Sequence, residues 1–273
     1  MSTLSEITRE LLKKSKLKIK KRLGQHFLID KDILQRILAA AELAKEDLAI
    51  EIGTGLGTFT KELAERVAKV ITVEIDQKLL EVARDFLKDY KNIEFIREDI
   101  LEVDLSPYPQ AKIVANLPYY ITTPIIEKLI EAKPKLIVLT VQREVAERIV
   151  SKPASKDYGS FSIFVQYHTI PEIISFVPKS AFLPRPEVSS AILKLTPRKG
   201  PAVEVKDEKL FFEIVRAAFQ QRRKTLKKAL SSKFGLSKVE SALSQAQIDP
   251  KRRGETLSLA EFASICNALS SMI

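Results

Sequence analysis

At 273 residues, with 45% hydrophobic and 29% charged residues, the chain has the size and composition of a soluble globular protein with one large and one small domain. No apolar run approaches the roughly 20 residues that span a bilayer, and the basic N-terminus lacks the apolar segment of a secretory signal. One cysteine and two histidines exclude an intramolecular disulfide and argue against a zinc centre. We therefore expect a cytoplasmic protein that needs no metal.

The net charge of +10 is unevenly distributed along the chain. Residues 1–22 carry eight Lys/Arg and two Glu, a net +6, and residues 197–273 carry fifteen Lys/Arg and eight Asp/Glu, a net +7. The intervening residues, 23–196, have a net charge of −3. Basic ends without exposed aromatic or Leu-rich anchors favour nucleic acid over membrane as the partner. For residues 1–22 alone, a solvated and unstructured tail is an equally good interpretation.

From about residue 30 to 196, helical and strand-like patterns alternate. A helix is predicted from 30 to 44 behind Asp30 as N-cap, and further helices over 58–67, 77–87, 123–132 and 142–150. The predicted strands are LAIEIG, KVITVEID, IEFIRED, AKIVANL and KLIVLTV, followed by IPEIISFVP and VSSAILKLTP. Apolar strands that alternate with helices predict an α/β fold of the Rossmann-like kind, with a mostly parallel sheet covered by helices on both faces.

A Pro/Gly/Lys-rich linker, PRKGPAV (197–203), precedes a purely helical pattern. Three helical stretches follow, and the first runs without interruption from about residue 208 to 231. We therefore expect three regions: a basic N-terminal extension (1–22), an α/β domain (23–196) and a small all-helical C-terminal domain (197–273).

Ligands of open α/β sheets bind at the carboxyl ends of the strands, so the residues there are the first candidates for a site. Four successive predicted strands end in Glu51-Ile-Gly-Thr-Gly-Leu-Gly57, Val73-Glu-Ile-Asp76, Arg97-Glu-Asp-Ile100 and Asn116-Leu-Pro-Tyr119. The glycines allow close backbone approach, and carboxylates at the next two ends can bind ribose hydroxyls and an adenine amino group. Each stretch alone is more often a turn, but four in this order are hard to explain as turns. The G-x-G-x-G spacing differs from the G-x-G-x-x-G of nicotinamide dehydrogenases.

This set of strand ends resembles the S-adenosylmethionine-dependent methyltransferases, and Asn-Leu-Pro-Tyr is similar to the motif of enzymes that methylate exocyclic amino groups of bases. Three further stretches resemble the ribosomal RNA adenine dimethyltransferase family: LGQHFL (23–28), VQREVA (141–146) and FLPRPEVS (182–189). The stretch FQQRRKTL (219–226) resembles the branch that modifies small-subunit RNA. The chain departs from the family at His26, where Asn is usual, and this puts the cofactor contact of that position in question.

The resemblance implies S-adenosylmethionine as the cofactor of the 23–196 domain. Its implied binding residues are Gln25, His26, Leu28, Glu51, Gly53, Gly55, Glu74, Asp99, Ile100 and Asn116. Glu74 would bind the ribose, and Asp99 the adenine amino group beside the apolar wall of Ile100. For Glu51 two alternatives stay open: a water-mediated contact with the methionine end, or a buried carboxylate that caps the N–H groups of the glycine loop.

The implied catalytic residues are Asn116, Leu117, Pro118, Tyr119 and Phe182. Hydrogen-bond acceptors aimed at the adenine amino group favour a localised lone pair on its nitrogen, which is otherwise delocalised into the ring. The side-chain oxygen of Asn116 and the carbonyl of Leu117 are the expected acceptors, on a backbone that Pro118 fixes. Tyr119 is expected to stack on an unpaired base, with Phe182 on its second face. We expect the neighbouring Tyr120 to serve packing.

Basic residues of the C-terminal domain are expected to bind RNA. On one continuous helix over 211–230, Arg216, Arg223 and Lys227 fall on one face at three- to four-residue spacing. The expected RNA-binding residues are Arg222, Arg223, Lys224, Lys227 and Lys228. A solvated helix face is the alternative interpretation.

The resemblance as a whole implies N6,N6-dimethylation of adenosines, two adjacent ones near the 3′ end of small-subunit (16S) ribosomal RNA. We expect the protein to act as a monomer on the RNA of an assembling small subunit. Two alternatives stay open: a large-subunit (23S) dimethylase, and an RNA-binding assembly or transcription factor on the same scaffold.

Overall fold

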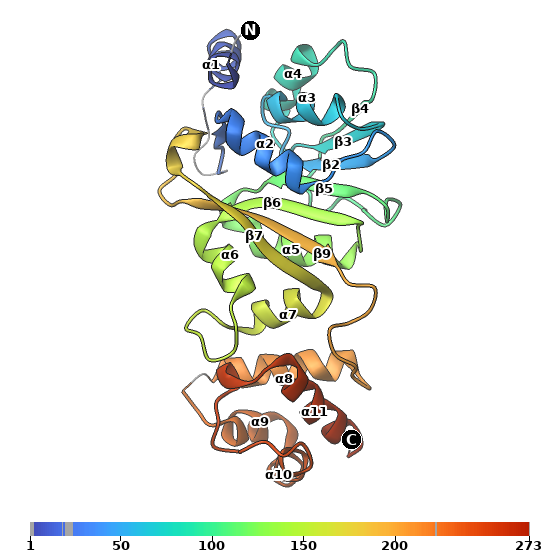
Figure 1. Cartoon of the computed structure of the whole chain (residues 1–273), viewed down its shortest axis with the longest axis vertical. Coiled ribbons are helices and arrows are strands. Elements are labelled where there is room, and N and C mark those ends of the chain that lie inside the picture. Colours follow the sequence, from blue (N-terminus) through green and yellow to red (C-terminus); the bar gives the residue numbers. More distant parts are fainter. Residues whose placement is uncertain (1–2, 18, 20–23, 222, 273) are drawn as a thin grey trace. The chain divides into compact units, whose positions relative to one another are not determined.

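The computed structural model describes residues 3–17, 19, 24–221 and 223–272, and it forms two compact units (Figure 1). The first comprises Met1–Ala146 and Glu172–Pro197, and the second comprises Glu147–Pro171 and Arg198–Ile273. Residues 147–171, which the sequence pattern grouped with the α/β region, thus belong to the same unit as the C-terminal helices. Within the described part of the chain, no helix is long and apolar enough to cross a membrane.

A seven-stranded sheet organises the first unit. Its strands are β2 (Leu48–Ile52), β3 (Lys69–Val73), β4 (Ile93–Ile96), β5 (Lys112–Asn116), β6 (Leu136–Gln142), β7 (Thr169–Val177) and β9 (Ser190–Pro197). The spatial order is β4-β3-β2-β5-β6-β9-β7. Strands β2 to β6 pair in parallel and β9 runs antiparallel to β6, which confirms the predicted mostly parallel sheet. The carboxyl ends of β3, β2, β5 and β6 therefore lie on the same side of the sheet. The chain adds β3 on one side of β2 and β5 on the other, so the strand order reverses at β2.

Helices connect these strands and cover the sheet on both sides (Figure 1). They are α2 (Lys31–Ala40), α3 (Thr58–Ala64), α4 (Gln77–Phe86), α5 (Thr122–Glu131) and α6 (Arg143–Val150). Asp30 caps α2 by accepting from the N–H groups of Asp32 and Ile33, as its position before the apolar pattern predicted. The central strands are buried almost throughout, because both faces of the sheet are covered.

Two helices and two short strands were not predicted. Helix α1 (Leu4–Ser15) begins with a capping box between Thr3 and Glu6, so the interpretation of 1–22 as an unstructured tail is wrong for these residues. Strands β1 (Phe27–Leu28) and β8 (Phe182–Leu183) form a separate antiparallel pair. Helix α7 (Ser160–His168) belongs to the second unit. The remainder of the N-terminal extension is only partly described.

The second unit packs its C-terminal helices around their own apolar core. They are α8 (Glu208–Gln220), α9 (Leu226–Phe234), α10 (Leu236–Gln245) and α11 (Leu259–Ser270). The continuous helix predicted over 211–230 is wrong, because α8 ends at Gln220. Thr225 is extended and its hydroxyl caps α9, and the Leu226 N–H donates to the carbonyl of Arg252 at 2.6 Å. The bond to Arg252 therefore takes the place of the hydrogen bond that Leu226 would make within a continuous helix.

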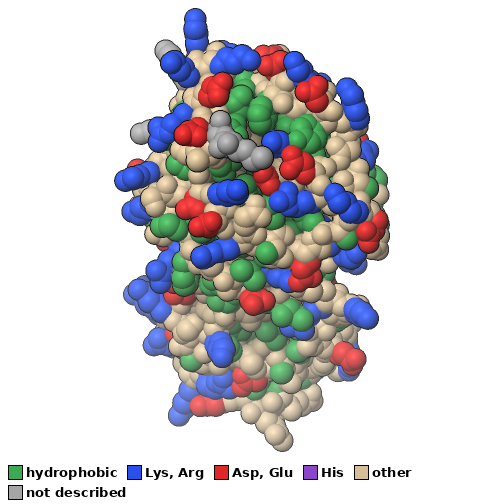
Figure 2. Space-filling view, turned by 45° about the horizontal axis from the view of Figure 1, so that its top comes forward, with side chains coloured by type: hydrophobic (Ala, Val, Ile, Leu, Met, Phe, Trp, Pro, Cys, Tyr) green, Lys and Arg blue, Asp and Glu red, His purple; other side chains and the backbone are tan. Residues whose placement is uncertain are grey.

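Charged side chains of both signs are interspersed over the face seen in Figure 2, so the net charge of +10 does not form a single-sign surface there. Among the described residues, the ion pair between Lys112 and Asp47 is buried. Lys112 and Asp47 are each 6% exposed, and Lys112 Nζ lies 2.7 Å from Asp47 Oδ2. Burial alone would raise the pKa of Asp47, but hydrogen bonds from Lys112 and from the Ala44 N–H hold it below its ordinary value.

We predict that Lys112→Met destabilises the fold by about 3 kcal/mol or more, because it leaves Asp47 buried without its main partner. The free energy of unfolding from chemical denaturation at pH 7 measures the effect. Lys135→Met is the matched control, since Lys135 is 54% exposed and lies 3.6 Å from the same carboxylate. A loss below about 1 kcal/mol is expected there. Equal losses in the two variants would contradict the importance of the buried pair.

Candidate active site

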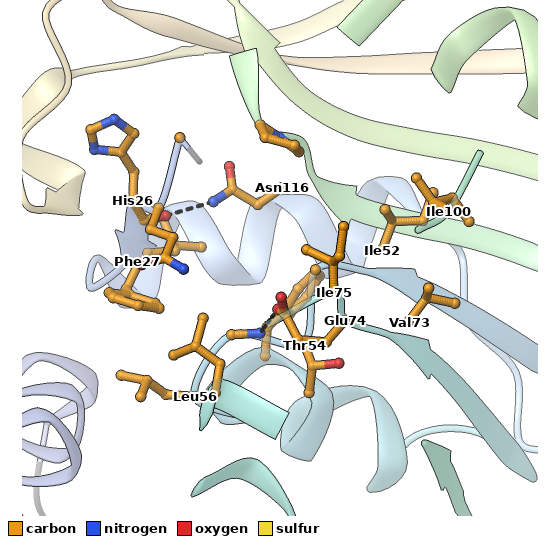
Figure 3. A pocket seen from close by; sticks show the side chains of 18 of the residues that line it. His26, Phe27, Ile52, Thr54, Leu56, Val73, Glu74, Ile75, Ile100 and Asn116 are labelled. Carbon is orange, nitrogen blue, oxygen red and sulfur yellow. Dashed lines mark hydrogen bonds between the residues drawn. The ribbon is translucent and has the colours of Figure 1, made fainter. Parts of the chain in front are cut away.

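A pocket that is open to solvent lies at the carboxyl ends of the parallel strands (Figure 3). Segments far apart in the sequence line it: the stretch before α2, the glycine loop after β2, the ends of β3, β4 and β5, and the start of α5. The predicted residues that line it are Gln25, His26, Leu28, Gly53, Gly55, Glu74, Asp99, Ile100, Asn116 and Pro118. Glu51, Leu117, Tyr119 and Phe182 do not line it.

The glycine loop is held open by a carboxylate from the next strand. Gly55 has φ +55, and its N–H donates to Glu74 Oε2 at 3.0 Å (Figure 3). A side chain at Gly55 would meet the ring of Phe27 at 3.3 Å, so this position needs glycine for both its backbone conformation and its contact. The second oxygen of Glu74 accepts from the Asp76 N–H at 2.8 Å, and burial raises the pKa of this carboxyl.

The lining of the pocket is acidic. Glu74, Glu98 and Asp99 contribute carboxyl groups, and none of the described residues that line the pocket is Lys or Arg. A lining with carboxyl groups and without such cations favours a ligand with hydroxyl, amino or cationic groups over a pyrophosphate, although Thr58, at the N-terminus of α3, also lines the pocket. This composition disfavours a nicotinamide dinucleotide. It suits a positively charged nucleoside.

Glu51 lies beneath the glycine loop rather than in the pocket. Its side chain is fully buried, and Oε2 accepts from the hydroxyls of Thr60 and Thr72, each at 2.6 Å. Thr72 also bonds Thr54 of the loop at 2.6 Å. Burial raises the pKa of Glu51 to about 8. The carboxyl therefore supports the loop through threonine hydroxyls, and Oε1 has no hydrogen-bond partner among the described residues.

Asn116 ends β5 and is oriented by the N-terminal segment. Its Nδ2 donates to the backbone carbonyl of His26 at 2.8 Å (Figure 3). A carbonyl can only accept, so this bond identifies the nitrogen and leaves Oδ1 as the acceptor of the amide, without a hydrogen-bond donor among the described residues. The segment approaches closely because Gly24 has φ +62, and a side chain there would lie 3.2 Å from the ring of Pro118. The next residue, Leu117, is buried and donates its N–H to Thr140 of β6.

Tyr119 is anchored at both ends of its side chain. The ring stacks on the imidazole of His26 at a centroid distance of 5.6 Å, and the hydroxyl bonds Ser190 Oγ at 2.6 Å. Burial raises the pKa of Tyr119, so the phenol stays neutral at pH 7. His26 Nδ1 lies 2.8 Å from the carbonyl of Pro184, which requires the proton on Nδ1. The His26 side chain therefore contacts the Pro184 loop and Tyr119.

Two sequence expectations fail in this region. Phe182, the expected second face of a base clamp, is 1% exposed, since β8 pairs with β1 and its side chain packs in the core. Tyr120, the expected packing residue, is 57% exposed and lines the pocket instead. Sequence reasoning also missed Thr60, Thr72 and Ser190, because hydroxyl residues inside helices and strands carry no signal of their own.

The basic residues expected to bind RNA do not share one helix face. Arg223 and Lys224 are exposed in the turn between α8 and α9, and Lys228 is exposed on α9. Lys227 forms an ion pair with Glu240. Arg222 lies outside the described residues.

The strand order, the glycine loop and the acidic strand ends together define a Rossmann-like methyltransferase. Among solved structures, a dimethyladenosine transferase from Plasmodium falciparum matches with a TM-score of 0.75 and 26% identity over 88% of this chain and 96% of that one. The 23S rRNA methyltransferase ErmE matches with a TM-score of 0.71 and 27% identity over 89% and 99%.

The chain belongs to the ribosomal RNA adenine dimethylase family, whose model matches residues 16–271. Among curated relatives, the ribosomal RNA small subunit methyltransferase A of Geobacillus sp. (strain WCH70) is 46% identical over 281 residues, 97% of each chain. The protein of the same name from Caldanaerobacter subterraneus subsp. tengcongensis is 48% identical over 267 residues, 94% of this chain and 99% of that one.

We predict that Glu51 makes stability fall as pH rises between 5 and 8. In this range the folded chain keeps a proton that the unfolded chain, with an ordinary carboxyl pKa of 4.5, has released. Glu51→Gln keeps an acceptor for both threonines and cannot titrate. Between pH 5 and pH 8 the free energy of unfolding should therefore decrease by about 3 kcal/mol more in the wild type than in the variant. Parallel pH curves would show that Glu51 titrates normally.

Proposed function

We propose that the protein transfers two methyl groups from S-adenosylmethionine to N6 of adenosines in small-subunit ribosomal RNA. The orientation of Asn116 carries the proposal, because an amide oxygen kept free at the fourth strand end is the acceptor that activation of an amino group requires. Relatives named for the small subunit are 46–48% identical, whereas the 23S enzyme is 27% identical. The small subunit is therefore the favoured substrate over the large one.

The pocket fits the proposed cofactor. Glu74 would hold the ribose hydroxyls, and Asp99 would accept from the adenine amino group next to the buried side chain of Ile100. The glycine loop leaves its backbone accessible for the methionine portion. An acidic lining without Lys or Arg among the described lining residues complements a cation. When bound, S-adenosylmethionine supplies an electrophilic methyl group on a positively charged sulfur.

The residues of the fourth strand end would prepare the nucleophile. Asn116 Oδ1 would accept one amino hydrogen of the adenine, and the carbonyl of Leu117 would accept the other. Both bonds favour a tetrahedral nitrogen whose lone pair is directed away from the ring. Alkylation makes the nitrogen acidic enough to release its proton to water, so a neutral amide suffices at position 116. Alignment of the nitrogen with the methyl group supplies much of the acceleration.

The target base must leave its helix or start single-stranded to reach this pocket. Tyr119 would receive it, since its ring is oriented by His26 and its hydroxyl is fixed by Ser190. The exposed Arg223, Lys224 and Lys228 would add phosphate contacts from the second unit. A purely RNA-binding assembly factor would not need an oriented amide in a cofactor-sized pocket.

Labelled methyl transfer from S-adenosylmethionine to unmodified small subunits, with the products mapped by nucleotide, tests the proposal. We predict dimethylated adenosines in the small-subunit RNA, and no transfer to large subunits assayed in parallel. Short naked oligonucleotides with the target sequence should be methylated more slowly, because phosphate contacts read shape rather than sequence. Absence of label in small subunits would refute the proposed function.

We predict that Asn116→Ala lowers the methylation rate by about 10²-fold or more, as expected for loss of a hydrogen bond made in the transition state. Affinity for S-adenosylhomocysteine, measured by calorimetry, should change little. Asn92→Ala is a control for general damage, because Asn92 donates to the carbonyls of Ala64 and Val67 away from the pocket. Turnover near the wild-type rate in Asn116→Ala would remove the role assigned to this amide.

A further inference from the structure

Two sequence motifs lie next to each other in the sheet, and the proposed reaction assigns neither of them a role. They are VQREVA, which spans the end of β6 and the start of α6, and FLPRPEVS, which precedes β9. Gln142 pairs with Ser190 in the sheet, and the Arg143 N–H donates to the carbonyl of Ser189 at 3.0 Å. Ser190 is the residue that holds the hydroxyl of Tyr119. Arg143 therefore follows directly the residue that pairs with Ser190, which anchors Tyr119, the residue expected to stack on the target base.

The guanidinium of Arg143 lies over an exposed aromatic ring. Its guanidinium carbon lies 4.4 Å from the ring centroid of Phe176, on β7, the strand next to β9. Phe176 is 47% exposed, so much of its ring is accessible to a ligand. The pair therefore lies near the anchor of Tyr119, because Arg143 directly follows Gln142, the residue that pairs with Ser190.

The surroundings are suited to a polyanion. The loop 178–189 carries Lys179 and Arg185, both exposed, against one acidic residue, Glu187. Val188, 38% exposed, adds apolar surface to the same loop. An aromatic ring stacked under a guanidinium offers a planar surface for a base and N–H donors for a phosphate, a combination that single-stranded RNA uses.

We propose that Arg143 and Phe176 form a platform for the nucleotide next to the target adenosine, with Phe176 stacking on its base and Arg143 binding its phosphate. The inference rests on the proposed function, since it names a substrate contact of that same site. The platform would hold the RNA strand on one side of Tyr119 while the target base occupies the pocket. Phe176 and Arg143 would thus contribute to binding of the substrate and leave the chemical step unchanged.

Steady-state methylation of unmodified small subunits tests the platform, with kcat and KM determined separately. Phe176→Ala should raise KM about ten-fold, as expected for loss of one stacked base, with kcat within about two-fold of the wild type. Phe176→Trp should restore KM, whereas Phe176→Leu should not, because apolar area without a planar ring cannot stack. Ile170→Ala is the matched control, since Ile170 lies on the same strand and is 53% exposed.

Arg143→Gln should raise KM and reduce the salt dependence of KM, while Phe176→Ala should leave that dependence unchanged. Affinity for S-adenosylhomocysteine and the melting temperature should stay at wild-type values in all variants. An equal KM in Phe176→Ala and Ile170→Ala, or a full rescue by Leu, would overturn the platform. A wild-type protein that transfers no methyl to small subunits would refute the proposed function instead, so the two failures are distinguishable.

Discussion

The hydrogen bond from Asn116 to the His26 carbonyl is the interaction on which the rest of the site depends. It joins the segment before α2 to the end of β5, and it decides which end of the amide faces a substrate. Gly24 makes the approach possible, and the ring of His26 extends the same connection to Tyr119 and to the Pro184 loop. One residue outside the sheet thus fixes the orientation of the amide to which the proposed function assigns activation of the substrate.

Two carboxyl groups, one in the pocket lining and one buried beneath it, support the same glycine loop by different means. Glu74 binds the Gly55 N–H directly, whereas Glu51 acts through the hydroxyls of Thr72 and Thr60. Because burial raises the pKa of Glu51 to about 8, the region below the loop is close to neutral at pH 7 while the pocket above it is acidic. The negative charge of the site is therefore concentrated where a ligand can neutralise it.

Much of this organisation was readable from the sequence. Strands buried on both faces give continuous apolar runs, and the ligand-facing residues follow them directly, so the sheet and ten of the 25 residues that line the pocket were predicted. What failed depends on contacts between distant segments. Phe182 is buried because β8 pairs with β1, about 155 positions away in the chain, and α9 is separate from α8, with the Leu226 N–H bonded to the distant carbonyl of Arg252. The exposure of Tyr120 follows from a 3-10 turn after Pro118 that no local pattern announces.

The acidic pocket has a consequence for repeated turnover. Dimethylation of one adenosine consumes two cofactor molecules, and under the proposed function each transfer converts a cationic sulfonium into a neutral thioether. Carboxylates such as Glu74 and Asp99 attract the cation more strongly than the neutral product, and no Lys or Arg of the described lining reverses this preference. The pocket therefore favours replacement of spent cofactor by fresh cofactor while the half-methylated adenosine is still at hand.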